Sequence, residues 1–138
     1  MDKKVKHLEL IQNVISRMAG NSFMMKGWAT VLFAGVCALA NEENGDLILL
    51  GVCIPLTCFW GLDAYYLSRE RLYRDLYEEV LKMNQDEIDF SLKITPKLHN
   101  KHNGVCSCFF SKTEAFFYLS LLVFIALVKI YLFFVFLF

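Results

Sequence analysis

Three charged side chains stand inside segments that are otherwise apolar, and they are the residues best placed to do chemistry in this chain. They are Lys26, Asp63 and Lys129. A charge inside a bilayer costs about 2.5–3.5 kcal/mol on insertion scales, so it needs an opposite charge, a water-filled path or a route to the interface. We therefore expect these side chains to serve a pore or a gate. An ion pair that only fixes helix orientation is the alternative.

Asp63 predicts a positively charged partner at the same depth in the membrane. Lys26 lies at the entrance of its apolar segment, and Arg69 follows Asp63 within two helical turns. Lys129 instead lies near the middle of the last apolar segment, too deep to meet Asp63 if that segment is a straight helix. We therefore expect Lys26 or Arg69 to pair with Asp63.

A second group, basic and aromatic, follows Asp63 and continues into the next loop. Its members are Arg69, Arg71, Arg74, Tyr73, Tyr77, Lys93 and Lys97. Cationic side chains attract phosphates and aromatic faces stack on bases, so the pattern predicts a cytoplasmic site for a nucleotide or oligonucleotide. Basic and aromatic residues also mark the inner membrane interface, and that is the alternative interpretation.

Four possible zinc ligands lie within ten residues of one another. His99, His102, Cys106 and Cys108 have the spacing H-x2-H-x3-C-x-C. The C-x-C pair is less usual for zinc than C-x2-C, so a loop that merely contains these residues is the favoured interpretation. No nucleophile motif, phosphate-binding loop or metalloprotease helix is visible, and we expect neither an enzyme nor a cofactor.

The segments that must position these residues are long enough to cross a bilayer, which takes about 20 apolar residues in a helix. We predict spans at 23–40, 47–67 and 115–138. The chain has 138 residues and is 57% hydrophobic, which leaves little for a separate soluble core. The sequence therefore predicts a single all-α membrane domain with three transmembrane helices.

The parts outside the spans are also expected to be largely helical. Residues 4–18 have apolar positions at helical spacing, which predicts an amphipathic helix that lies in the membrane interface or packs on the protein's own cytoplasmic part. Gly20 and Asn21 are expected to break it. The second span should continue as a cytoplasmic stalk at 68–83, and the loop at 84–112 should be irregular.

Orientation follows from the distribution of positive charge. The turn at 41–46 is acidic, and every Lys and Arg except Lys129 precedes it or follows the second span. The positive-inside rule then places the N-terminus in the cytoplasm and the C-terminus on the opposite side of the membrane. The first residues are charged and amphipathic, with no sign of a cleavable signal peptide.

Four blocks carry a resemblance to known proteins: RMAGNSFMMKGW, FWGLDAYYLSRERLYRDLY, IDFSLKITP and FSKTEAFFYL. In this order they resemble a family of small bacterial multi-span membrane proteins linked to antiphage defence, typified by the membrane channel effectors of Hailong systems. The resemblance implies a homo-oligomeric ion channel that depolarises the membrane. It also implies gating by short DNA oligomers made by a nucleotidyltransferase encoded nearby. A non-conducting anchor that recruits a cytoplasmic partner protein is the alternative.

Overall fold

The computed structural model describes residues 2–39 and 45–137, and within them the chain is helical without strands. Three long helices dominate: α1 (Lys3–Leu39), α2 (Gly45–Lys82) and α4 (Lys112–Leu137). Two 3₁₀ turns, η1 (Gln85–Glu87) and η2 (Pro96–Leu98), and the short α3 (Val105–Phe109) lie between α2 and α4. Each long helix contains a stretch apolar and long enough to cross a membrane, so the prediction of three spanning helices is confirmed at that level.

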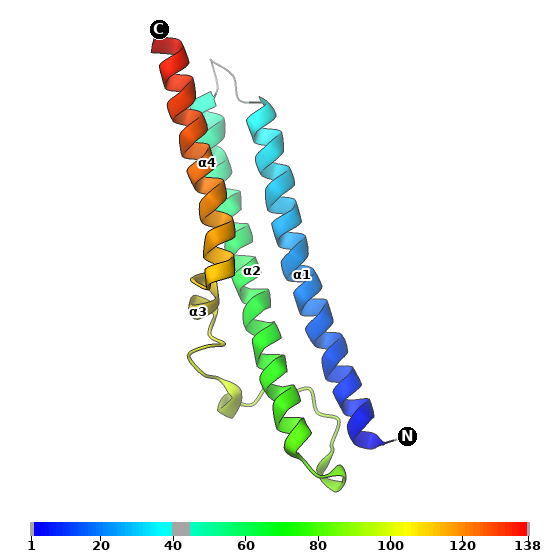
Figure 1. The fold of residues 1–138 in the computed structure, drawn as a ribbon. Helices are drawn as coiled ribbons and strands as arrows, with labels where there is room; N and C mark the ends of the chain where they lie inside the picture. The colour runs from blue at the N-terminus through cyan, green and yellow to red at the C-terminus, as the bar shows by residue number, and fades with distance from the viewer. Residues whose placement is uncertain (1, 40–44, 138) are drawn as a thin grey trace.

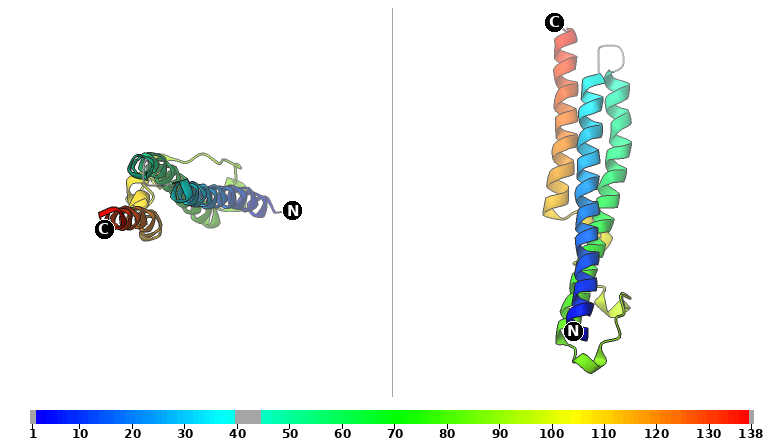
Figure 2. Two further views of the ribbon diagram at one scale, coloured as in Figure 1. Left: turned by 90° about the horizontal axis from the view of Figure 1, so that it is seen from above. Right: turned by 90° about the vertical axis from the view of Figure 1, so that its right-hand side faces the viewer.

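The two halves of the molecule differ in their number of helices. α1 and α2 run antiparallel along their whole length, and α4 lies beside only the half of α2 that contains its beginning (Figure 1). A side view shows α1, α2 and α4 next to one another in this half, with α1, α2 and the connecting loop in the other (Figure 2). We call the first half the membrane part and the second half the stalk, which comprises residues 3–18, 68–82 and 83–111.

Helix length explains this division. α1 has 37 residues and α2 has 38, so each is roughly 55 Å long at about 1.5 Å per residue. The hydrocarbon core of a bilayer is only about 30 Å thick, so each helix is much longer than a spanning segment needs to be. The expected continuation of the second span into a stalk is confirmed, and α2 runs through Pro55 without interruption.

Each half has an apolar core of its own. In the membrane part, Leu56 and Trp60 of α2 pack with Ala29 of α1 and Tyr118 of α4. In the stalk, an apolar stripe of α1 meets an apolar stripe of α2, and side chains from the loop cover the contact. The buried members of the stalk core are Ile11, Ile15, Leu76 and Val80, and the loop contributes Ile88, Leu92, Ile94 and Leu98.

The expected break after the N-terminal helix is wrong. Gly20 and Asn21 are helical, and residues 4–18 belong to the same continuous helix as the first span. A glycine inside a helix costs only about 1 kcal/mol relative to alanine, which packing of the flanking segments readily offsets. Ile11 and Ile15 pack against α2, so the apolar stripe of this segment covers the protein's own stalk.

The remaining boundaries agree closely with the pattern of the sequence. α4 begins three residues before the predicted third span, because Lys112 to Glu114 form its first turn. The acidic turn lies mostly outside the described residues, since only residues 45 and 46 are described and both belong to α2. The loop at 84–112 is irregular apart from its two 3₁₀ turns and α3, which was not predicted.

Polar contacts fasten the loop along α2 and back to α1. Lys4 Nζ donates to the carbonyl oxygens of Leu81 and Met83 at 2.7 and 3.0 Å, which joins the start of α1 to the end of α2. Ser68 Oγ donates to the Asn103 carbonyl at 2.6 Å, and Asn103 Nδ2 donates to Asp75 Oδ2 at 2.8 Å. The loop is therefore a fixed part of the stalk.

Candidate functional site at the junction of the three long helices

One lysine joins all three long helices. Lys26 Nζ of α1 lies 2.5 Å from Asp63 Oδ2 of α2 and 2.9 Å from Glu114 Oε1 of α4. Two carboxylates from different helices thus share one ammonium group. Because Glu114 belongs to the first turn of α4, the contact fixes the depth at which this helix starts.

Two hydroxyl groups complete the arrangement around Asp63. Ser22 Oγ of α1 donates to Asp63 Oδ1, and Tyr118 OH of α4 donates to Asp63 Oδ2 at 3.1 Å. Lys26 Nζ also donates to Ser22 Oγ at 3.2 Å. The aspartate therefore accepts hydrogen bonds from both neighbouring helices. We call the five residues Ser22, Lys26, Asp63, Glu114 and Tyr118 the ion cluster.

The ion cluster is shielded from its surroundings on most sides. Asp63 is 0% exposed and Glu114 is 2% exposed, whereas the Lys26 side chain keeps 24% of its surface accessible. Tyr118 stacks on Trp60 with ring centroids 5.6 Å apart, and Trp60 stacks on Phe109 at 4.1 Å. Among the charged groups of the cluster, Lys26 is therefore the one with an appreciable accessible surface.

The cluster has more negative than positive charge. With both acids ionised, Lys26 balances one carboxylate and leaves one negative charge over. Glu114 Oε2 is buried and has no hydrogen-bond partner among the described residues. A buried polar atom left without a partner costs about 1–3 kcal/mol, and more if it is charged. A proton or a small cation at Glu114 would remove both defects, so the site is chemically suited to take up either.

The structure brings some of the predicted pore or gate residues together and separates others. The pairing of Asp63 with Lys26 is confirmed. Arg69, the other proposed partner, lies over the Tyr65 ring at 5.1 Å from its centroid. Lys129 is exposed on α4, roughly 22 Å along the helix axis from Glu114, so it does not belong to the cluster.

Sequence reasoning did not find Ser22, Glu114 and Tyr118 as members of this site. A signal for them exists in the spacing, because Ser22 precedes Lys26 by four residues and Tyr118 follows Glu114 by four. Residues four apart lie on the same face of a helix, so each of these pairs presents two polar groups to one neighbour. The spacing does not say which helix each pair contacts, so it identifies a site only once the facing helix is known.

The predicted nucleotide-binding residues are distributed over the stalk. Arg74 Nη2 pairs with Glu70 Oε1 at 2.7 Å, and Arg71 Nη1 donates to the His102 carbonyl at 2.7 Å. Tyr73 and Tyr77 pack against the stalk core. Lys93 and Lys97 are exposed in the loop.

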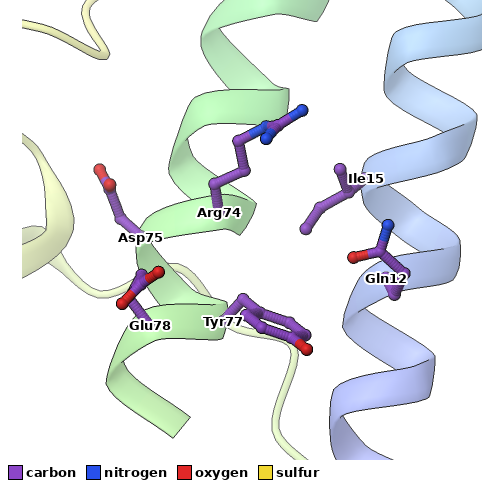
Figure 3. A pocket seen from close by; sticks show the side chains of 6 residues that line it. All are labelled: Gln12, Ile15, Arg74, Asp75, Tyr77 and Glu78. Carbon is purple, nitrogen blue, oxygen red and sulfur yellow. The ribbon is translucent and has the colours of Figure 1, made fainter. Parts of the chain in front are cut away.

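Arg74 and Tyr77 share an open cleft of about 460 Å³ between α1 and α2 (Figure 3). Its other lining residues are Gln12, Ile15, Asp75 and Glu78. The two carboxylates of Asp75 and Glu78 offset the guanidinium of Arg74, so the cleft is mixed in charge. Arg71 lines a different cavity, and Arg69 stacks on Tyr65. The nucleotide-binding role of the seven residues stays a prediction.

The possible zinc ligands do not form a metal site among the described residues. Within that part of the chain, no three His, Cys, Asp or Glu side chains gather closely enough to hold a metal ion. Cys108 is buried, while His99, His102 and Cys106 are exposed. The C-x-C pair falls in α3, where its two cysteines point to different environments.

Comparison of the chain with protein-family models, with characterised proteins and with solved structures finds no match.

Proposed function

We propose that this protein is a homo-oligomeric ion channel of the bacterial inner membrane, and that the ion cluster controls its conduction. The supporting observation is the buried group of one ammonium and two carboxylates at the meeting point of the three long helices. Ionisable residues inside a membrane segment are costly and mark ion paths, proton relays or sensors.

An oligomer is part of this proposal because one chain provides too few helices. Three spans cannot enclose a polar path, so several subunits must surround a common axis. Gly27 and Gly35 of α1 and Gly51 of α2 are exposed, and small residues of this kind permit close approach of helices in a membrane. The subunits would therefore meet through the faces of α1 and α2 that carry these glycines.

The stalk supplies a way to couple a cytoplasmic signal to the cluster. α1 and α2 each run without a break from the stalk core into the membrane part, so a change in their packing at Ile11 and Leu76 would be carried to Lys26 and Asp63. A short DNA oligomer made by a nearby nucleotidyltransferase is the signal that the resemblance implies. Opening would depolarise the membrane during phage infection.

The orientation belongs to the same proposal. The stalk and N-terminus would face the cytoplasm and the end of α4 the periplasm, as the positive-inside rule requires. A phosphatase reporter that is active only outside the cytoplasm should be silent when fused at residue 100 and active after residue 138. Activity at residue 100 would reverse the orientation and remove the stalk as the site of a cytoplasmic signal.

Conductance measurements test the channel itself. The purified protein is reconstituted in planar bilayers, and short single-stranded DNA oligomers are added on the stalk side. We expect discrete conductance steps in the wild type and an altered cation-to-anion permeability ratio in Glu114→Gln. Glu9→Gln removes an exposed stalk carboxylate and should match the wild type. Absence of conductance with and without DNA, at several voltages, would overturn the proposal.

One observation favours the alternative, a non-conducting membrane anchor. The stalk is an ordered unit with its own core and an open cleft between α1 and α2 (Figure 3), which is the kind of surface that a partner protein could contact. The anchor predicts that removing the cleft residues Arg74 and Glu78 abolishes recruitment of a cytoplasmic protein. It also predicts that planar bilayers containing the protein show no conductance, whereas the channel proposal predicts conductance steps.

A further inference from the structure

A second charged site lies where α3 leads into α4. A cavity of about 420 Å³ opens there at the surface of the molecule. It is lined by Arg71, His102, Ser107, Phe110, Ser111, Lys112 and Thr113. These residues come from α2, the loop, α3 and the start of α4, so the cavity depends on the folded arrangement of all four segments. The cavity is separate from the ion cluster and from the cleft between α1 and α2.

The lining of this cavity is strongly biased toward hydrogen-bond donors and positive charge. It contains a guanidinium, an ammonium, an imidazole and three hydroxyl groups, and no carboxylate. Two acids directly adjoin lining residues along the chain, and both are paired elsewhere: Glu70 with Arg74, and the buried Glu114 with Lys26. Arg71 is held in place because its Nη1 donates to the His102 carbonyl at 2.7 Å. An anion would meet no opposing negative charge from the lining residues.

An unsatisfied hydroxyl provides an independent sign of a ligand. Ser111 Oγ is buried and has no hydrogen-bond partner among the described residues, although it belongs to the lining of this cavity. It directly precedes α4, and the first turn of a helix has backbone N–H groups that no helical carbonyl accepts. The positive end of the helix dipole favours an anion at the same place. An oxyanion with several acceptor oxygens would satisfy these donors together.

The position of the cavity indicates which anion it takes. After Glu114, α4 is apolar except at Ser120 and Lys129, so the cavity lies at the level where the helix enters the membrane. Phe110 is 74% exposed and Phe116 is 80% exposed, which places large apolar surfaces on either side of Lys112. A soluble ion uses only the charged groups, whereas a phospholipid also covers the aromatic side chains with its acyl chains.

We propose that this cavity binds the phosphate of an anionic phospholipid headgroup, with Arg71 and Lys112 as its principal charged contacts. Ser111 Oγ and the first amides of α4 would donate to the remaining phosphate oxygens. The lipid would fix the depth of α4 in the membrane. This inference does not rest on the channel proposal, since an anchor would need the same fixed depth.

Native mass spectrometry of lipids retained by the purified protein tests the proposal. The protein is placed in nanodiscs of phosphatidylcholine with one fifth phosphatidylglycerol, then released and analysed. We expect the wild type to keep phosphatidylglycerol, and Arg71→Gln/Lys112→Gln to lose about 30-fold in retention, because each cation near an anionic surface contributes roughly a fivefold preference. Lys93→Gln/Lys97→Gln removes the same charge from exposed loop positions and should behave as the wild type.

Further variants and probes separate this site from other sources of the same signal. Lys112 is exposed, so Lys112→Gln alone should fold normally and still lower retention, while Arg71→Lys/Lys112→Arg should restore it. If Arg71→Gln/Lys112→Gln and Lys93→Gln/Lys97→Gln lost equal amounts of phosphatidylglycerol retention, the effect would be one of general surface charge, and the proposal would be overturned. Inorganic phosphate that stabilises the protein in pure phosphatidylcholine nanodiscs, without selective lipid retention, would assign the cavity to a soluble ion. Retention of short DNA in place of phosphatidylglycerol would likewise overturn it.

Discussion

Removing the shared ammonium group should destabilise this protein far more than removing one of its two acids. In Lys26→Met, Asp63 and Glu114, which are 0% and 2% exposed in the wild type, lose the ammonium group that is their ion-pair partner among the described residues. Breaking a buried ion pair from one side typically costs about 3–5 kcal/mol. We expect a value near the lower end, about 3 kcal/mol, because the Lys26 side chain is 24% exposed and water can enter where it leaves.

Glu114→Gln, by contrast, should change the stability of the protein only slightly. The amide keeps an oxygen that can accept from Lys26 and removes the charge that the cluster does not balance. Its amide nitrogen would replace Glu114 Oε2, which accepts no hydrogen bond from the described residues, so no hydrogen bond is lost. We therefore expect the free energy of unfolding to change by no more than about 1 kcal/mol. The variant can be more stable than the wild type, because the substitution removes the negative charge that Lys26 does not balance. Combined with Lys26→Met, the same substitution should recover part of the loss, because only one buried carboxylate remains.

The assay is unfolding of the purified protein in mixed micelles by increasing the fraction of a denaturing detergent, followed by far-ultraviolet circular dichroism. Four proteins form a double-mutant cycle: wild type, Lys26→Met, Glu114→Gln and the combination. A coupling free energy between the two sites is then obtained directly. The reasoning is that two buried carboxylates share one ammonium group. It would be refuted if Glu114→Gln were as destabilising as Lys26→Met, or if the losses were additive in the double variant.

Three further results are expected. Tyr118→Phe removes a hydroxyl that donates to the cluster's aspartate at 3.1 Å and should cost about 1.5–3 kcal/mol in the same unfolding assay; a change near zero would show that the hydroxyl contributes nothing. Burial raises the pKa of the Cys108 thiol, so in single-cysteine variants Cys108 should react with a maleimide more slowly than exposed Cys106 and need a higher pH; equal rates in the folded protein would contradict the buried position. Ile11→Ala should cost about 2–5 kcal/mol and expose the loop to proteolysis, whereas the exposed Val5→Ala should do neither; resistance of both variants would mean that the stalk core does not hold the loop.

The spans and the stalk could be predicted because hydrophobicity and helical spacing are local properties. An uninterrupted apolar run of sufficient length specifies a spanning helix whatever its neighbours are. The continuation of α2 into the stalk followed from the spacing of Leu72, Leu76 and Val80. The break expected at Gly20 was wrong because a local helix preference of about 1 kcal/mol is smaller than the packing on both sides of it.

The stalk illustrates the limit of an amphipathic pattern. The apolar stripe through Ile11 and Ile15 was readable from the sequence, but the pattern reports only that one face is apolar and not what covers it. Lipid and a neighbouring helix both satisfy such a face. The tertiary structure decides, because α2 presents Leu76 and Val80 at the matching height and the loop covers the contact.

The sequence by itself determined that Asp63 needs a partner, since a lone carboxylate in a membrane segment is too costly to leave unpaired. The expected depth of each cation in the membrane left Lys26 and Arg69 as the possible partners of Asp63. Only the tertiary structure selected Lys26 and added Glu114 and Tyr118, because these contacts depend on how α1 and α4 are rotated against α2. That rotation is set by packing between residues far apart in the sequence, such as the stacking of Trp60 on Tyr118, and no periodicity within one helix can specify it.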